Sequence, residues 1–339
     1  MTFKKVSVIT IAGAALLAGA IGIAISLTSP NEIEIEVPEA PMEQETELSE
    51  DGIKTLENME NMPIYFDDSD VLLLPLRNVM EGLGGSVKWD TETRAAEVSY
   101  RGRTLAVQPG EKGAVLNGYE VTLPQGVEMI NGCLYADEKL ISAYYTGEVA
   151  FNRETRQVTL QTKDSTVPLL AVKEISGEKD GRSYQVEVPV IVGLNDSNFE
   201  KNLNKSMMEK MQAYVDTYLA AEEQSGKLQL TVQTGMCTKD FLSFWWEGTE
   251  DGVSVKIAEN IDLLGQKTVT LSDMLEEASL KEVETFAGEG WTAEHFFLTS
   301  EGGLVLLKGS NEGGLELHYW TTEGKQLVWK DAYKELFQK

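Results

Sequence analysis

The chain has 339 residues, of which 29 are basic and 55 are acidic, so its formal charge is −26. A surface this negative repels a phosphate backbone, which excludes nucleic acid as an expected partner. The hydrophobic content of 42% is that of a globular protein, and the length is sufficient for two domains with separate cores.

An apolar segment at the N-terminus predicts export. Lys4 and Lys5 precede a run from Val6 to Leu27 that only three hydroxyl residues interrupt, long enough to span a hydrocarbon core of ~30 Å. Positive charge before the run and negative charge after it favour residues 1–28 as a single-pass membrane anchor, with a cytoplasmic N-terminus and extracytoplasmic C-terminal domains. The alternative is a signal peptide cleaved near Ala24-Ile25-Ser26, followed by secretion.

The segment that follows predicts a spacer. Residues 29–62 contain eleven acidic side chains, a single base, Lys54, and three prolines, with little apolar periodicity. Such a composition cannot bury enough apolar surface to fold. We therefore expect residues 29–62 to form an acidic disordered spacer.

One unit of the sequence occurs twice. Residues 71–98 align without a gap on residues 133–160, at an offset of about 62 residues. The aligned pairs are Trp89 with Phe151, Asp90 with Asn152, and Arg94 with Arg156. This match predicts a duplicated supersecondary module.

The first copy shows what the unit should be. Pro75 is suited to a first helical turn, and the apolar residues after it recur at i, i+3, i+4 and i+7. Gly84-Gly85 should end the helix, and apolar residues then alternate with polar ones on both sides of a turn at Asp90. We expect a helix followed by a β-hairpin, with Trp89 and Phe151 at equivalent core positions.

The stretch LLLPLRNVMEGLGGSVKWDTETRAAEVSY resembles the repeat of the copper amine oxidase N-terminal-like domain, a stalk module of bacterial surface proteins. Its hallmarks are a Pro-Leu-Arg helix, here with Pro75 and Arg77, a Gly pair, and Trp-Asp-x-x-Thr-Arg. The second copy has Ala136-Asp137-Glu138-Lys139 in place of the Pro-Leu-Arg start. The resemblance implies a mostly β, non-catalytic stalk domain over residues 63–163.

Residues 170–339 predict a second domain of a different kind. Tyr184–Val192 alternates as a long strand, and an amphipathic helix should follow to about Glu223, with Ser197 and Glu200 as a capping box. Several further alternating segments and a last short helix near Asp331–Phe337 complete the pattern. The predicted fold class is α+β, an antiparallel sheet with one long helix.

The distal domain carries a resemblance of its own. VEVPVIVGLNDSNFEKNLNKSMMEKMQAYVD, NIDLLGQKTVTLSDML and LVWKDAYKELF are similar, in that order, to the extracytoplasmic domain shared by lysozyme-sensing anti-sigma factors and some peptidoglycan deacetylases. Two loops depart from that family, at Glu247–Gly252 and Lys308–Gly314. The resemblance implies an extracytoplasmic sensing domain and does not extend to those loops.

The sequence predicts a non-catalytic protein with no catalytic, metal-binding or cofactor-binding residues. His295 and His318 are the sole histidines, too few for a copper or zinc site with histidine ligands. We expect a membrane-anchored binding or sensing protein of a Gram-positive cell envelope, whose ligand is a cationic wall-active protein or peptidoglycan. The alternative is an envelope enzyme, or an accessory subunit of one, acting on a cell wall polymer. The oligomeric state stays open.

Two aromatic residues are the candidate ligand-binding residues. Phe244, Trp245 and Trp246 stand in one predicted strand, so Trp245 should lie on the face opposite the other two. An exposed Trp245 or Trp246 could stack on a sugar or a partner protein. The competing interpretation is that the helix and neighbouring loops bury all three rings.

Overall fold

The computed structural model describes residues 52–56, 59, 61–66, 71–162, 166–221, 225–289, 291–309, 315–320 and 327–337. The predicted membrane anchor, residues 1–28, and most of the predicted spacer lie outside these ranges. No helix within them combines the length and hydropathy that a membrane span requires.

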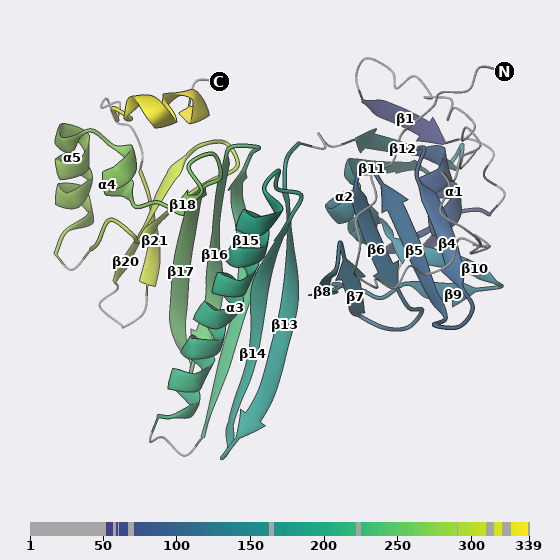
Figure 1. The fold of residues 1–339 in the computed structure, drawn as a ribbon, viewed down its shortest axis with the longest axis horizontal. Coiled ribbons are helices and arrows are strands. Elements are labelled where there is room, and N and C mark those ends of the chain that lie inside the picture. The colour runs from purple at the N-terminus through teal and green to yellow at the C-terminus, as the bar shows by residue number, and fades with distance from the viewer. Residues whose placement is uncertain are drawn as a thin grey trace, which may run out of the picture. The chain divides into compact units, whose positions relative to one another are not determined.

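The repeat module has the duplicated architecture that the sequence predicts (Figure 1). Each copy is a strand, a short helix and a two-stranded hairpin, with matching elements 62 residues apart. The first copy comprises β3 (Val71–Pro75), α1 (Leu76–Gly82), β4 (Ser86–Asp90) and β5 (Ala95–Tyr100). The second comprises β10 (Cys133–Asp137), α2 (Glu138–Tyr144), β11 (Thr146–Asn152) and β12 (Gln157–Thr162).

The two copies meet through equivalent strands. β3 and β10 pair antiparallel, and Leu74 lies directly opposite Ala136, its own equivalent in the other copy. Both side chains are fully buried. Because an element that faces its own copy in antiparallel register defines a local two-fold axis, this pair relates β3 to β10 by an approximate two-fold rotation.

A third strand extends each hairpin, and the two added strands come from different parts of the chain. β6 (Arg103–Val107) pairs with β5, and β7 (Gly113–Leu116) and β8 (Tyr119–Thr122) extend that sheet to five strands. β1 (Ile53–Leu56) pairs with β12 in the second copy. β2 (Ile64–Phe66) and β9 (Glu128–Ile130) flank β3 and β10. The predicted spacer of residues 29–62 is therefore wrong at its C-terminal end, since Ile53–Leu56 is part of the folded module.

The hairpin turns are built alike in both copies. The Asp90 carboxylate accepts the backbone N–H groups of Glu92 at 2.8 Å and Thr93 at 3.3 Å, which lowers the pKa of Asp90. Asn152 accepts the equivalent pair of N–H groups at 3.0 and 3.1 Å. Arg94 and Arg156 end the turns in left-handed conformations, with φ of 54° and 57°. The Asp/Asn and Arg positions of the repeat thus have backbone roles.

The expected core position of Trp89 is wrong in part. Trp89 is 39% exposed and Phe151 is half-buried. Both rings face the core side of their hairpins, because their cross-strand partners, Ala96 and Val158, are buried. They stay accessible because β4 and β11 are edge strands.

The helix starts differ between the copies. Pro75 is the N-cap residue of α1, one position before the first turn, and donates no hydrogen bond there. Arg77 lies on the exposed side of α1 and pairs with Glu81 at 3.3 Å. In α2 the side chain of Asp137 takes the N-cap role by accepting the Lys139 N–H at 2.7 Å. The second copy therefore starts its helix with a carboxylate where the first uses a proline.

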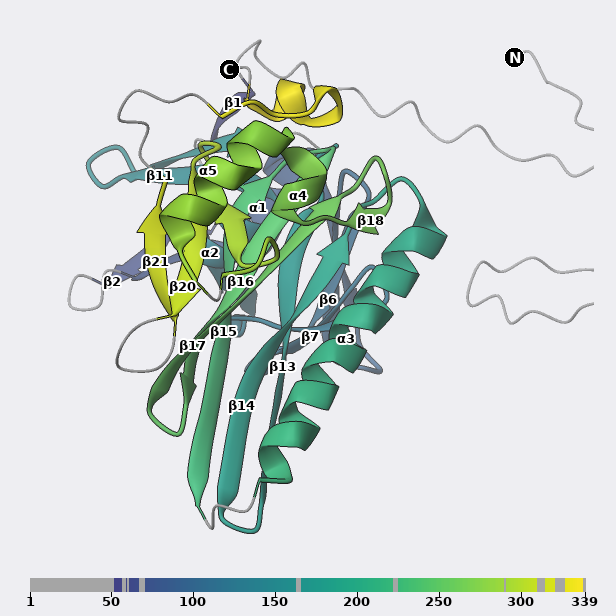
Figure 2. The ribbon, with the colours of Figure 1, turned by 90° about the vertical axis from the view of Figure 1, so that its left-hand side faces the viewer.

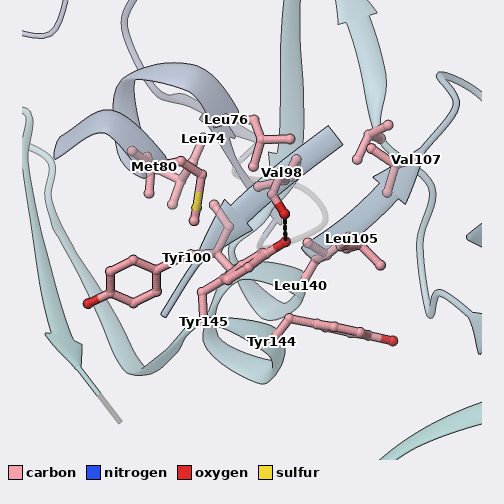
Figure 3. Close-up of a cluster of buried hydrophobic side chains, with 14 of the residues drawn as sticks. Leu74, Leu76, Met80, Val98, Tyr100, Leu105, Val107, Leu140, Tyr144 and Tyr145 are labelled. Atoms are coloured by element: carbon pink, nitrogen blue, oxygen red, sulfur yellow. Dashed lines mark hydrogen bonds between the residues drawn. The ribbon is translucent and has the colours of Figure 1, made fainter. Parts of the chain in front are cut away.

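The module core lies between the hairpins and the two helices. Tyr145 is buried there, and its hydroxyl donates to the Val98 carbonyl at 3.2 Å (Figure 3). Leu74, Met80, Leu105 and Leu140 surround it in the same cluster. The cluster draws on both copies, so neither hairpin could bury its apolar face alone.

The distal domain centres on a six-stranded sheet. Its strands follow chain order and are β13 (Leu169–Lys179), β14 (Arg182–Val192), β15 (Gly226–Cys237), β16 (Phe241–Glu250), β17 (Val253–Asp262) and β18 (Lys267–Thr268). The predicted antiparallel sheet is wrong at one place: β14 and β15 are parallel. The long helix α3 (Ser197–Leu219) lies between them in the sequence and returns the chain to the same end of the sheet.

The start of α3 differs from the predicted capping box. Asp196, not Ser197, is the N-cap residue, and its carboxylate accepts the N–H groups of Asn198 and Phe199 at 2.9 and 3.0 Å. The Glu200 carboxylate instead accepts the N–H groups of Gly193 and Leu194, which fixes the loop that enters the helix.

A second layer packs on the sheet. It contains the small sheet of β19 (Phe296–Leu298), β20 (Leu304–Gly309) and β21 (Leu315–Tyr319), with α4 (Leu271–Met274), α5 (Glu277–Ala287) and the 3₁₀ helix η1 (Asp331–Phe337) beside it. Figure 2 shows α3 on one side of the six-stranded sheet and β20 and β21 on the other. The α+β class is confirmed, although the prediction of one long helix missed α4 and α5.

Candidate functional site

The six-stranded sheet has two chemically different faces. The face under α3 is apolar and contributes Phe244 and Trp246 to the core with α3. On the opposite face Trp245 packs with residues of the small sheet. The alternation predicted for these three aromatic residues is therefore observed.

Trp246 is part of the core. Its side chain is 0% exposed and meets Phe244 edge to face, with ring centroids 5.3 Å apart. The indole N–H donates to the Glu187 carbonyl at 2.8 Å. The structure leaves Trp246 no ring face for stacking on a ligand.

Trp245 is half-buried. One face of its indole stacks on Phe297, with centroids 3.8 Å apart and planes 16° from parallel. Its N–H points to the Glu247 carboxylate at 3.4 Å. Ligand binding by Trp245 stays a prediction, and Phe297 confines any stacking partner to the other ring face.

The small sheet packs on only part of this face. We name the remaining part, together with Trp245 at its border, the outer sheet face, and its residues are mostly polar. The cross-strand rows place Gln233 beside Trp245, Thr231 between the strands that carry Glu187 and Glu247, and Gln229 beside Thr249. The outer sheet face includes Glu174, Glu178, Gln185, Glu187, Lys227, Gln229, Thr231, Gln233, Trp245, Glu247, Thr249 and Lys256. Amides, hydroxyls and carboxylates there are well suited to hydrogen bonding with a ligand.

A gap in the strand pairing shapes this face. The parallel pairing of β14 and β15 ends at Val186 and Leu230, and beyond it the Glu187 carboxylate accepts the Val232 N–H at 2.7 Å. A side chain thus replaces a main-chain hydrogen bond where the strands separate. Burial raises the pKa of Glu187, and the negative charge of Glu174 raises it further.

The outer sheet face carries more carboxylates than ammonium groups. Glu174 accepts a hydrogen bond from Gln185 at 2.9 Å, and Glu247 pairs with Lys256 at 2.6 Å. The bond from Lys256 lowers the pKa of Glu247. Two further carboxylates, those of Glu174 and Glu187, lack such an ion pair among the described contacts, so the face is acidic.

The described ranges contain no candidate metal site. Within them no three or more His, Cys, Asp and Glu side chains form a group that could hold a metal ion. His295 lies just before β19 and His318 within β21. The outer sheet face is thus a candidate binding surface, and sequence reasoning found only Trp245 of its residues.

Comparisons with known proteins support the assignment of the repeat module. Residues 52–160 match the family described as "Copper amine oxidase N-terminal domain", which confirms the first resemblance. A protein named "Primary amine oxidase" from Klebsiella aerogenes is 28% identical over 80 residues, which are 24% of this chain and 11% of that enzyme.

The match to a second relative covers more residues. A protein named "Protease inhibitor" from Brevibacillus choshinensis is 24% identical over 200 residues, covering 55% of this chain and 61% of that protein. The matches thus span less than two thirds of either relative.

Solved structures show weaker similarity. A DUF3298 family member from Bacteroides fragilis gives a TM-score of 0.35 at 12% identity, covering 49% of this chain and 95% of that one. A DUF3298 family protein from Pseudomonas aeruginosa gives 0.28 at 16% identity, covering 41% and 81%. The resemblance to anti-sigma factor and deacetylase domains stays a prediction.

Proposed function

We propose that this chain is a non-catalytic binding protein of the cell envelope, anchored in the membrane by residues 1–28, whose distal domain binds a cationic extracellular protein. The acidic charge carries the proposal. The whole chain has a formal charge of −26, and the outer sheet face adds a local surface on which carboxylates outnumber ammonium groups. Such a field attracts basic proteins and raises their association rate.

The relative named "Protease inhibitor" supports a protein as the ligand. An inhibitor of a protease must bind a folded protein, and it does so without chemistry of its own. Secreted proteases therefore stand beside lysozyme-like proteins as ligands to test for this chain.

A second candidate ligand is the glycan of peptidoglycan. The observation that favours it is the half-buried indole of Trp245, with Gln233 beside it in the cross-strand row. Sugars stack on aromatic faces and form hydrogen bonds with amides. Stacking of this kind depends little on ionic strength, which separates the two candidates.

Binding of the full-length chain in mild detergent to hen lysozyme, α-chymotrypsin and isolated peptidoglycan tests both. A cationic protein should bind at ~0.01 M salt, where the Debye length is ~30 Å, and much less at ~0.15 M, where it is ~8 Å. Retention of peptidoglycan alone, unchanged by salt, would favour the glycan. Binding of none of the three at low salt would refute the proposed function.

Matched variants locate the surface. Thr231→Lys adds one positive charge to the exposed middle of the outer sheet face, whereas Ala213→Lys adds the same charge to the exposed side of α3. We expect the first variant to slow association with lysozyme several-fold more than the second. Equal effects would mean that the total charge acts and the outer sheet face has no special part.

The proposed location has its own test. Protease added to intact protoplasts should release the part of the chain beyond Leu27, because the acidic residues follow the apolar segment on the outer side. Full protection of the chain would show that the orientation is wrong.

A further inference from the structure

Two tight turns of the repeat module have the same sequence and nearly the same backbone conformation. Asn117-Gly118 joins β7 to β8, and Asn131-Gly132 joins β9 to β10 (Figure 1). The φ values are 47° and 90° in the first turn and 51° and 79° in the second. Positive φ at both central residues is typical of a type I′ hairpin turn, which favours Asn-Gly. A difference in the chemistry of the two asparagines must therefore come from their side-chain contacts.

The side chain of Asn117 is bound to the neighbouring turn of the same sheet. Its Oδ1 accepts the Thr104 N–H at 2.7 Å, and its Nδ2 donates to the Gly102 carbonyl at 3.1 Å. The Asn117 N–H also donates to the Thr104 carbonyl at 2.8 Å. Both polar atoms of the side-chain amide are thus engaged, and rotation of this amide would break two hydrogen bonds.

The side chain of Asn131 has no such restraint. It is exposed, and in the part of the chain that the structure describes it takes part in no hydrogen bond, ion pair or ring contact. Gly132 is exposed as well, and a Cβ atom placed there would meet nothing within 4 Å. The Asn131 amide can therefore move among its rotamers beside the uncrowded main chain of Gly132.

An asparagine followed by a glycine can react without a catalyst. The main-chain nitrogen of the glycine attacks Cγ of the asparagine, the Cγ–Nδ2 bond breaks, and the side-chain nitrogen leaves as ammonia with the proton that the glycine nitrogen loses. The product is a five-membered succinimide ring, which water opens to either aspartate or isoaspartate. Glycine favours this reaction because it has no side chain to hinder the approach of Cγ to its nitrogen.

We propose that Asn131 is a site of spontaneous deamidation in the folded protein, and that side-chain hydrogen bonds protect Asn117 from the same reaction. The attack requires Cγ to swing toward the following nitrogen, which breaks two hydrogen bonds at Asn117 and none of the described ones at Asn131. Two hydrogen bonds of ordinary net strength correspond to a rate difference of about 10-fold or more. The inference is independent of the proposed binding function, because it involves no ligand.

The reaction would change one edge of the repeat module. Aspartate adds a negative charge and leaves Asp-Gly, a sequence that a type I′ turn accepts. Isoaspartate adds a carbon atom to the main chain of the two-residue turn that places Ile130 opposite Cys133. Because β9 has three residues and lies at the edge of its sheet, we expect the isoaspartate form to release β9 while β10 stays paired with β3.

Mass spectrometry of the full-length chain in mild detergent tests the proposal. The chain is kept at mildly alkaline pH and sampled over weeks, and the peptides that contain Asn117 or Asn131 are quantified as asparagine, aspartate and isoaspartate forms. In the folded chain Asn131 should convert about 10-fold or more faster than Asn117. The chain unfolded in urea is the matched control, because both sites are then Asn-Gly after a branched apolar residue and should convert at similar rates.

A variant separates the added charge from the main-chain change. Hydrogen exchange of the β9 amides should become faster in a sample rich in the isoaspartate form and stay unchanged in Asn131→Asp. Equal conversion of the two asparagines in the folded chain would overturn the proposal, because their side-chain contacts would then not decide the reaction. Conversion of both in urea and of neither in the folded chain would overturn it as well, since the turn itself would then protect Asn131.

Discussion

Replacing Ser243 by Ala should destabilise the distal domain, because this buried hydroxyl joins the two sheets. Ser243 Oγ donates to Asn260 Oδ1 at 2.7 Å and accepts the Leu298 N–H at 2.8 Å. Asn260 in turn donates to the Phe296 carbonyl at 2.8 Å. Ser243 is 0% exposed, so water cannot take its place.

The expected loss follows from the groups left behind. Ser243→Ala leaves the Leu298 N–H and Asn260 Oδ1 without this hydroxyl, and each buried polar group without a partner costs about 1–3 kcal/mol. Allowing for partial relaxation, the free energy of unfolding should fall by about 2–4 kcal/mol. With a urea m-value of about 2–3 kcal/mol/M, the midpoint of unfolding should drop by about 0.7–2 M.

Urea denaturation followed by tryptophan fluorescence measures the change, since Trp245 stacks on Phe297 of β19 and reports on the junction. Ser176→Ala, at an exposed position on β13, is the control and should shift the midpoint little. If Ser243→Ala behaves like Ser176→Ala at an unchanged m-value, the buried network does not stabilise the packing of the two sheets.

Three further predictions concern the backbone and the pH dependence. A Cβ atom at Gly248 would lie 1.8 Å from the backbone of the neighbouring strand, whereas a Cβ atom at Gly113 would meet nothing within 4 Å. Gly248→Ala should therefore destabilise the protein by at least about 2 kcal/mol, and Gly113→Ala should be neutral or stabilising. Thermal unfolding of the two variants measures the difference. Arg94→Gly and Arg156→Gly should each raise the free energy of unfolding by between 0 and about 1 kcal/mol, because glycine adopts the left-handed backbone conformation without steric cost. A marked loss of stability in either variant would show that the arginine side chain matters. Burial raises the pKa of Tyr333 to about 12, above its ordinary 10, so stability should fall as the pH rises from 10 to 12, and Tyr333→Phe should reduce that slope in urea titrations.

The repeat module was predictable because its signals are local. A constant offset of 62 residues carried the strand, helix and hairpin from one copy to the other. Asn117 and Gly118, an Asn-Gly pair of the kind that favours a two-residue hairpin turn, both have positive φ values. What the sequence could not show was β1, because Ile53–Leu56 lies in a run of acidic residues and becomes a strand only by pairing with β12. Long-range pairing overrides local composition in this case.

The sheet of the distal domain shows a similar limit. Alternation identified β14 and β16, but an alternating strand looks the same in parallel and antiparallel pairing, so the parallel contact of β14 with β15 was missed. The prediction assigned no helix to the segment that contains the short α4 and α5. Thr270 begins α4 with a capping box formed with Asp273, and the Thr-x-x-Asp spacing is a helix-start signal that the sequence carries.

The sequence predicts the surroundings of some surface residues better than those of others. Strand periodicity places Trp245 on the outer sheet face, but it cannot show that Phe297, distant in the chain, covers one side of the ring. For the leucine pair at 263 and 264, no local rule says which side chain the core takes. That choice depends on Asp240 and Asp196, which fix the turn from two other loops, so exposure of Leu264 is a property of the tertiary fold. Exposure of this kind is invisible to motif reading, because an ordinary apolar residue carries no local signal that the tertiary fold will leave it at the surface.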